Sequence, residues 1–364
     1  MKRIAILAPY VGVVNRGAET FVIELTKKLS KFYDIDVYST GVSKLIYKNC
    51  IVINCIPSPF LKYHTKLYER FSFYRKIVNK FYYIIPDVLF QRAFTKKAFK
   101  VIDNNKYDLL FPNNGVWGAK YSKIYRKKTG TPFIYTGHGG IGPGERIILG
   151  YEPDYYICLT TKHYNWAKKH CAVNKTQLTI IPNGVNVSCF SKHKAQNKST
   201  KRIISVAALT SFKRHQLSIL AISKLNNVDL VILGNGEEKK CLLNLVDKVL
   251  RKRCTITSVP YESIKDWYSK SDLFVLPSLE EPFGIVYLEA MASNIPIVAP
   301  DDEQRREIIG TAGLFCDVEN IDEYAKTISQ ALSMEWGDIP YERAKLFDWG
   351  LVSNKYMNLI ESLF

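Results

Sequence analysis

The sequence predicts an α/β protein with two doubly wound domains. Strand-like and helix-like segments alternate along the chain, as they do in parallel sheets whose strands are joined by crossover helices. The alternation stops at a polar segment, residues 187–202, and then begins again with a new strand and loop. A chain of 364 residues is too long for one ordinary domain and long enough for two domains with separate cores.

The first series begins with an apolar strand and an amphipathic helix. Strands are expected over residues 3–10, 35–40, 108–114, 132–138 and 155–160, and helices over 18–31 and 161–170. Residues 1–14 also have the charged start and apolar run of a short signal peptide. Because Arg16 and Glu19 stand where a cleavage site would lie, we interpret the run as the first strand.

The second series contains the most distinctive stretch, residues 278–300. Strands are expected over residues 202–209, 228–236, 254–260, 273–277 and 295–299, and helices over 213–225, 262–271, 285–293 and 320–332. The last two strands enclose an acidic loop with Glu281, then Gly284, then a helix with Glu289. Ligands of parallel α/β sheets bind at the carboxyl ends of the strands. Free amides near Gly284 and the positive end of the helix therefore predict a phosphate site.

Three further loops are candidate anion sites. A glycine-bearing loop between the first strand and helix ends with Arg16 and Gly17, and Gly234 begins a Gly-Asn-Gly turn. Lys213 and Arg214 stand at the start of a helix. The amino end of a helix is unfavourable for cations unless an anion is bound there, so Lys213 indicates an anionic ligand.

The net charge of +17 is distributed unevenly. Residues 1–185 hold 29 Lys and Arg against 11 Asp and Glu, whereas residues 186–364 hold 22 against 23. We therefore expect the first half to face an anionic partner. The eight cysteines show no Cys-x-x-Cys pair and no metal-binding spacing, which favours reduced thiols in a cytoplasmic protein. No apolar run approaches the roughly 18 residues of a membrane span.

Residues 61–100 are unusual in composition. They include ten Lys or Arg, two acids and eleven Tyr or Phe, and they predict two or three amphipathic helices broken at Pro86. Aromatic rings and cations together suit an anionic lipid surface, which would place the protein at the cytoplasmic face of a membrane. An ordinary helical layer with buried aromatics and solvated lysines explains the composition equally well.

The series of motifs closely resembles glycosyltransferase family 4, which comprises retaining, nucleotide-sugar-dependent enzymes of the GT-B fold. The resemblance covers essentially the whole chain and rests on Glu-Pro-Phe-Gly at 281–284, Glu289, Ala-Pro at 299–300 and Pro-Asn-Gly-Val at 182–185. It implies that Glu281 contacts hydroxyls of the donor sugar and that Glu289 binds the ribose. The amides implied to meet the sugar and diphosphate are those of Phe283, Gly284, Ile285 and Val286.

The resemblance assigns roles to residues outside that stretch. His138 resembles the residue that faces the donor sugar, and Lys213 occupies the place of the lysine that binds the diphosphate. The chain departs from the family pattern where Ala18 replaces a glycine and where Ala207-Ala208 stands in place of Gly-Arg. The second departure removes one phosphate contact, for which Arg16 or Arg214 can compensate.

The implied fold is GT-B, with two Rossmann-like domains facing each other across a cleft. Residues 1–185 would form the acceptor-side domain and residues 186–340 the nucleotide-sugar domain. Residues 341–364 resemble the closing helix of the family, which packs back on the first domain.

The implied function is transfer of a sugar from a nucleotide-diphosphate sugar to a glycan or lipid-linked acceptor, with retention, in cell-surface polysaccharide or glycoconjugate synthesis. No side chain stands out as a nucleophile, which favours departure and attack on one face of the sugar over a covalent intermediate. We expect no metal and no other cofactor, because Lys213, helix ends and loop amides would stabilise the diphosphate. Asp34-Ile35-Asp36 resembles a metal-binding Asp-x-Asp motif but flanks an alternating strand.

Two alternative classes remain open. One is a membrane- or nucleic-acid-binding protein whose basic half is its function, although no nucleic-acid motif accompanies the charge. The other is a sugar-nucleotide epimerase or a phosphorylase on the same fold. The sequence does not specify the nucleotide, the sugar, the acceptor or the oligomeric state.

Overall fold

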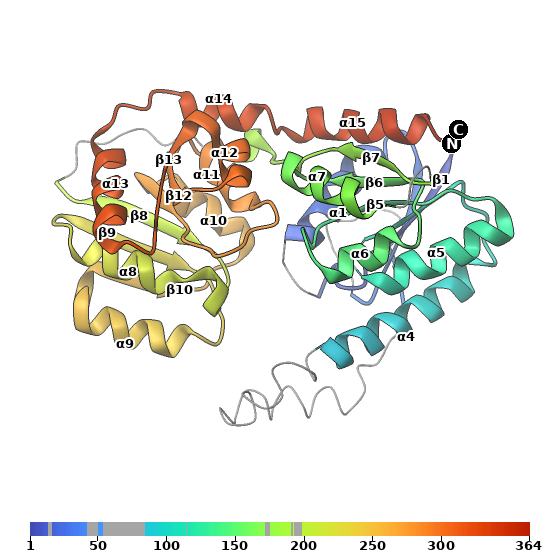
Figure 1. Ribbon diagram of the computed structural model, residues 1–364, viewed down its shortest axis with the longest axis horizontal. Coiled ribbons are helices and arrows are strands. Elements are labelled where there is room, and N and C mark those ends of the chain that lie inside the picture. The colour runs from blue at the N-terminus through green and yellow to red at the C-terminus, as the bar shows by residue number, and fades with distance from the viewer. Residues whose placement is uncertain are drawn as a thin grey trace. The chain divides into compact units, whose positions relative to one another are not determined.

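The computed structural model describes residues 1–13, 17–41, 50–53, 84–113, 115–171, 175–190, 192 and 199–364, with the backbone alone for 84–87 (Figure 1). The chain forms two compact units. Unit 1 comprises Met1–Ile181 together with Ser353–Phe364, and unit 2 comprises Pro182–Val352.

Unit 1 is built on parallel strands. These are β1 (Arg3–Leu7), β2 (Asp34–Ser39), β3 (Cys50–Val52), β4 (Leu109–Pro112), β5 (Ile134–Thr136), β6 (Tyr155–Cys158) and β7 (Gln177–Ile180). They form two sheets in the orders β3-β2-β1-β4 and β5-β6-β7. The amide of Leu110 in β4 donates to the Pro132 carbonyl at 3.0 Å, and Leu110 forms a parallel bridge with Phe133, so the two sheets continue into one another.

The helices of unit 1 bury aromatic side chains against these strands. They are α1 (Gly17–Leu29), α4 (Ile84–Ile102), α5 (Val116–Thr129), α6 (Pro143–Leu149), α7 (Thr161–His170) and the second part of α15 (Trp349–Glu361). Phe21 of α1 packs against Tyr356 of α15, with ring centroids 5.6 Å apart. The Tyr356 hydroxyl lies 3.0 Å from that of Thr136 at the end of β5. The carboxyl-terminal helix is thereby part of the unit 1 core.

Unit 2 is a single parallel sheet of six strands. They are β8 (Lys201–Val206), β9 (Val228–Leu233), β10 (Cys254–Thr257), β11 (Leu273–Val275), β12 (Ile297–Pro300) and β13 (Gly313–Cys316), in the order β10-β9-β8-β11-β12-β13. The chain moves outward from β8 to β10 and then returns to β11 on the other side of β8. This reversal is the topological switch point of a doubly wound sheet, so the predicted fold class is confirmed for both units.

The helices of unit 2 are α8 (His215–Ser223), α9 (Lys239–Val249), α10 (Tyr261–Tyr268), α11 (Ile285–Ala292), α12 (Glu303–Ile309), α13 (Ile321–Ser333) and α14 (Ile339–Lys345). A buried cluster joins α8, α9 and α13 to one face of the sheet, through side chains such as Ile219, Leu242, Ile328 and Leu230. Among the remaining helices, α11 contacts α10, α12 and α14.

Two predicted elements differ from the structure. Helix α4 runs through Pro86, so the predicted break there is wrong; Pro86 lies in the first turn, where its missing amide costs no helical hydrogen bond. The rest of the predicted helical stretch, residues 61–83, lies outside the described residues.

The expected single helix over 341–364 is two helices, α14 and α15. The chain between them pairs with the Pro-Asn-Gly-Val turn. The Val185 amide donates to the Phe347 carbonyl at 2.9 Å, and the Trp349 amide donates to the Val185 carbonyl at 3.0 Å. A side chain at Gly184 would lie 2.6 Å from the Trp349 ring, so this turn needs its glycine.

Candidate donor-binding site

The carboxyl ends of β8 and β11 carry the two loops that were predicted to bind a ligand. These strands are neighbours in the sheet, so the loops meet. The Leu279 amide donates to the Phe212 carbonyl at 2.8 Å, and Nε of Arg214 donates to the Pro277 carbonyl at 2.7 Å. These two bonds join the loops at the switch point of the unit 2 sheet.

Lys213 and Glu281 form an ion pair at this junction. Nζ of Lys213 lies 2.5 Å from Oε2 of Glu281, and the two side chains are 21% and 13% exposed. Residues that the sequence assigned separately to the diphosphate and to the sugar are therefore in direct contact. Enough of each side chain is exposed for a polar ligand to reach both.

A buried arginine holds the Glu281 loop from beneath. The Arg305 guanidinium, whose side chain is 5% exposed, donates to the Ser278 carbonyl at 2.6 Å and to the Tyr287 hydroxyl at 3.1 Å, and it pairs with Asp302. Sequence reasoning missed Arg305. The one local feature that points to Arg305 is Asp302, which caps helix α12 and accepts the Arg305 amide at 2.9 Å. This cap places Arg305 in the first turn of the helix.

The amino end of α11 offers free amides beside Glu281. Gly284 precedes the helix at φ 83° and ψ 68°, and a side chain there would lie 2.5 Å from the Tyr287 ring. Only glycine is suited to this conformation and this contact. Within the described part of the chain, no backbone carbonyl accepts the amides of Phe283, Gly284, Ile285 or Val286. Four such donors at a positive helix end form an anion site.

Glu289 lies on α11 and is enclosed by two tyrosines. The residue is 4% exposed, and its carboxyl accepts the hydroxyl of Tyr261 at 3.0 Å and that of Tyr268 at 3.2 Å. Burial raises the pKa of Glu289 to about 7, although both hydrogen bonds oppose the rise. Each carboxylate oxygen has a second lone pair, so the group can still accept ribose hydroxyls beside Tyr261, which is exposed.

Arg214 and Gly234 have internal contacts that the sequence did not reveal. Arg214 adopts φ 50° at the start of α8, and besides the Pro277 carbonyl it binds Glu319 at 2.6 Å. A side chain on Gly234 would lie 1.9 Å from the Ala207 carbonyl oxygen, because the loops after β8 and β9 are in close contact. This close approach explains why glycine stands at 234.

The candidate residues of unit 1 lie near the ends of β1 and β5. Gly17 is the first residue of α1, and Arg16 lies outside the described residues. His138 follows β5, and its ring packs on Phe21 at 4.4 Å between centroids. Its Nε2 is buried and has no hydrogen-bond partner among the residues the structure describes. Burial lowers the pKa of His138 to about 3, so the ring is neutral near pH 7.

A buried polar network supports the His138 loop. Glu145 of α6 accepts the Gly139 amide at 2.8 Å and the Tyr156 hydroxyl at 2.7 Å, and Tyr156 also contacts Nε2 of His163 at 3.0 Å. Burial raises the pKa of Glu145 to about 7. No local pattern indicated this network, because its members come from α6, β6 and α7.

Comparison with known proteins assigns the chain to a family. Residues 15–188 match the family described as Glycosyltransferase Family 4, and residues 190–346 match Glycosyl transferases group 1. An uncharacterized glycosyltransferase of Haemophilus influenzae is 32% identical over 341 residues, which are 90% of this chain and 89% of the relative. The chain belongs to this glycosyltransferase family.

Other relatives are similar over shorter lengths. An uncharacterized glycosyltransferase of Methanocaldococcus jannaschii is 35% identical over 285 residues, covering 68% of this glycosyltransferase and 72% of the relative. The O-antigen chain mannosyltransferase B of Escherichia coli is 31% identical over 142 residues, 37% of each chain.

Solved structures share the fold of the enzyme. Sucrose-phosphate synthase from Thermosynechococcus elongatus has a TM-score of 0.77 at 18% identity, covering 100% of this chain and 99% of its own. Anabaena HepE, in complex with UDP and glucose, has a TM-score of 0.75 at 15% identity over 100% of both chains. The glycosyltransferase therefore has the predicted GT-B fold. Among its described residues, no helix is long and apolar enough to cross a membrane.

Proposed function

We propose that this glycosyltransferase transfers a sugar from a nucleoside-diphosphate sugar to a glycan or lipid-linked acceptor with retention of configuration. The observation that carries the proposal is the convergence of Lys213, Glu281 and the free amides of residues 283–286 at one edge of the unit 2 sheet. HepE, of the same fold, was solved with UDP and glucose, and a relative is an O-antigen mannosyltransferase. The first supports a nucleotide donor, and the second supports a role in cell-surface polysaccharide synthesis.

The donor diphosphate would bind between Lys213 and the amino end of α11. There the ammonium and the amides neutralise charge as the diphosphate leaves, without reorganisation of solvent. Binding would draw Lys213 from Glu281, and the released carboxylate would accept hydroxyls of the sugar. Glu289 would bind the ribose. With these donors in place, the reaction would need no metal.

His138 would contact the donor sugar as a neutral ring. Its unpaired, buried Nε2 needs a hydrogen-bond partner, and a sugar hydroxyl can supply one. The Glu145 carboxyl holds the Gly139 amide next to it, which fixes the direction of the loop. No nucleophile is assigned, so the acceptor would attack the face from which the diphosphate departs.

Turnover of a donor panel tests the proposed function. UDP- and GDP-sugars are first screened by thermal shift, in which a ligand at 100 times its Kd adds about 2.7 kcal/mol of stability. The stabilising donor is then incubated with glycan and lipid-phosphate acceptors, and proton NMR of early product gives the anomer. We expect an anomer that matches the donor, and loss of turnover in Lys213→Ala but not in the surface control Lys240→Ala. Absence of turnover with every donor, or an inverted anomer, would contradict the proposal.

We also propose that unit 1 binds an anionic membrane surface, which would bring the enzyme to a lipid-linked acceptor. Helices α4 and α5 pack together and both carry exposed cations, namely Arg92, Lys96, Lys100, Lys120 and Lys127. Trp117 of α5 lies beneath two of them, with Arg92 at 5.0 Å and Lys120 at 4.9 Å from the ring. Each cation near an anionic leaflet contributes about 1 kcal/mol, so a few are sufficient for reversible binding.

Vesicle cosedimentation tests this surface. Wild type should bind vesicles with anionic lipid at low salt, release at high salt, and ignore neutral vesicles. Replacing Lys96, Lys100, Lys120 and Lys127 with Ser should abolish binding and preserve donor affinity. The matched control replaces four exposed lysines of unit 2, Lys240, Lys248, Lys265 and Lys326, and should still bind. Duplex DNA serves as a second anionic ligand, and preference for it over vesicles would refute the membrane role.

A further inference from the structure

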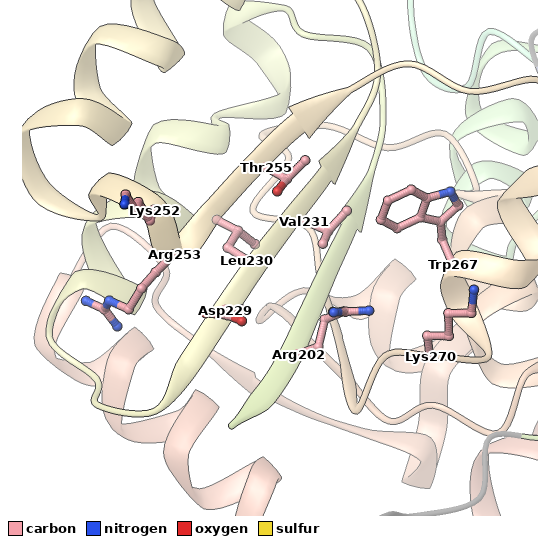
Figure 2. A pocket seen from close by; sticks show the side chains of 9 residues that line it. All are labelled: Arg202, Asp229, Leu230, Val231, Lys252, Arg253, Thr255, Trp267 and Lys270. Carbon is pink, nitrogen blue, oxygen red and sulfur yellow. The ribbon is translucent and has the colours of Figure 1, made fainter. Parts of the chain in front are cut away.

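Unit 2 has a hollow on the face of the sheet opposite the α8, α9 and α13 helices. It has a volume of about 300 Å³, and its floor is formed by β8, β9 and β10 (Figure 2). Asp229 and Val231 of β9 face it, whereas Val228 and Ile232 point into the buried cluster on the other side. Helix α10 borders this face through Trp267, and the floor combines the buried side chains of Leu230 and Val231 with the polar Asp229 and Thr255.

The hollow is separate from the donor site. Arg202 and Asp229 are the second residues of their strands, and they are register partners. The donor loops leave the opposite, carboxyl end of the same sheet, roughly 13 Å away along β8 at about 3.3 Å per residue. The two sites therefore share strands but no side chain.

Cations from three elements surround the hollow. Arg202 comes from β8, Lys252 and Arg253 from η3 (Arg251–Arg253), and Lys270 follows α10, against the single acid Asp229. Within the described residues, no salt bridge joins Arg202, Lys252 or Lys270 to a carboxylate, not even Arg202 to its strand neighbour Asp229. Figure 2 shows the Arg202 guanidinium directed toward the α10 side, where Lys270 lies. Lys252 and Arg253 lie on the β10 side, away from Arg202 and Lys270 (Figure 2), and Arg253 donates to the Leu225 and Val228 carbonyls. Arg202 and Lys270 are two cations on the α10 side with no salt bridge among the described residues, so together they suit one anion.

The remaining lining suits a sugar. Asp229 can accept hydroxyl hydrogen bonds, and Thr255, the register partner of Val231, can donate or accept them. Trp267 supplies a flat apolar wall on the α10 side (Figure 2). A space of about 300 Å³ is at the small end of ligand sites and accommodates a monosaccharide with one anionic group.

We propose that this hollow binds an anionic sugar residue, with its phosphate or carboxylate held by Arg202 and Lys270 and its hydroxyls by Asp229 and Thr255. Such a residue can come from a free sugar phosphate or from an acidic glycan. In either case the site is distinct from the donor site, and its occupation does not depend on turnover.

Calorimetry on the full-length protein tests the site, with glucose 6-phosphate, glucose and inorganic phosphate as probes. Glucose 6-phosphate should bind wild type more tightly than glucose or phosphate does. Arg202→Glu and Lys270→Glu should each weaken it at least about tenfold, since a charged hydrogen bond contributes at least that factor. Lys265→Glu is the matched control, because Lys265 is exposed on α10, the helix that precedes Lys270, and does not line the hollow.

Two further arms make the outcome decisive. Lys213→Ala, in the donor site, should leave glucose 6-phosphate binding unchanged. If this variant loses binding, the probe binds in the donor site and the proposal is overturned. The proposal is also overturned if wild type does not bind glucose 6-phosphate, if phosphate alone binds as tightly, or if Lys265→Glu weakens binding as much as Arg202→Glu does. An acidic tetrasaccharide such as tetragalacturonate, compared with glucose 6-phosphate, identifies whichever source binds more tightly. Unchanged thermal midpoints show that the variants fold.

Discussion

The buried carboxyl that supports the His138 loop predicts a specific dependence of stability on pH. Burial raises the pKa of Glu145 from 4.5 to about 7. The folded protein therefore holds this proton more tightly than the unfolded chain does. Its contribution to stability is fully present below pH 4.5 and is lost as the pH rises through about 7. A shift of this size, at about 1.36 kcal/mol per unit, corresponds to about 3 kcal/mol in total.

Glu145→Gln isolates this contribution, because glutamine keeps an oxygen for the Gly139 amide and cannot ionise. Urea unfolding of wild type and Glu145→Gln at pH 5 and pH 8 gives the difference in free energy at each pH. Relative to wild type, the free energy of unfolding of the variant should be about 2.5 kcal/mol higher at pH 8 than at pH 5. Buried histidines also make stability depend on pH in this range, because they titrate in the unfolded chain, but they are common to both proteins and cancel.

Glu152→Gln is the matched control, and its difference from wild type should barely change between pH 5 and pH 8. The neighbouring Lys123 holds the pKa of Glu152 below its usual range, so this carboxylate adds stability above its ordinary pKa and loses it as the pH falls. A difference for Glu145→Gln that does not change with pH would refute the reasoning, because it would mean that Glu145 ionises as in water.

Three further predictions concern the donor site and its support. Glu281→Ala should abolish transfer and leave the affinity for free nucleoside diphosphate nearly intact, whereas Glu289→Ala should weaken that affinity by about 1.5–3 kcal/mol; equal effects in calorimetry would exclude the two assigned roles. Turnover should persist in EDTA, and activity that disappears and returns with magnesium or manganese would show a metal requirement. Gly234→Ala should destabilise unit 2 by about 1–3 kcal/mol in urea unfolding, because its Cβ would lie 1.9 Å from the Ala207 carbonyl oxygen. Gly144→Ala has open space and should not destabilise; equal losses would contradict the steric argument.

Much of the fold follows from local patterns. Apolar runs and glycine-containing loops predicted the strands and their order along the chain. Because β8 and β11 are neighbours at the switch point, Lys213 and Glu281 meet although 68 residues separate them. Strand ends were less predictable. The first strand stops at Leu7 rather than residue 10, because residues 8–13 turn, with the Val11 amide bonded to Ala8 and the Val13 amide to Tyr10.

The contacts that enclose the site residues were not predictable. Tyr261 and Tyr268 reach Glu289 from 28 and 21 residues away, and a tyrosine in an amphipathic helix gives no sign of its partner. Arg305 was missed because an arginine in a charged helix normally lies in solvent, whereas this one is buried under the Ser278 loop. Such partners depend on how helices cross the sheet, which periodicity does not encode.

The affinity for a nucleoside diphosphate tests the central claim most directly. Calorimetry compares the diphosphate of the donor that the panel selects with its nucleoside, in wild type, Lys213→Ala and the surface control Lys240→Ala. We expect wild type to bind the diphosphate at least about tenfold more tightly than the nucleoside, and Lys213→Ala to lose most of that advantage. Lys240→Ala should keep it. Equal affinity for nucleoside and diphosphate in wild type, or an unchanged Lys213→Ala, would contradict the assignment of the donor site to unit 2.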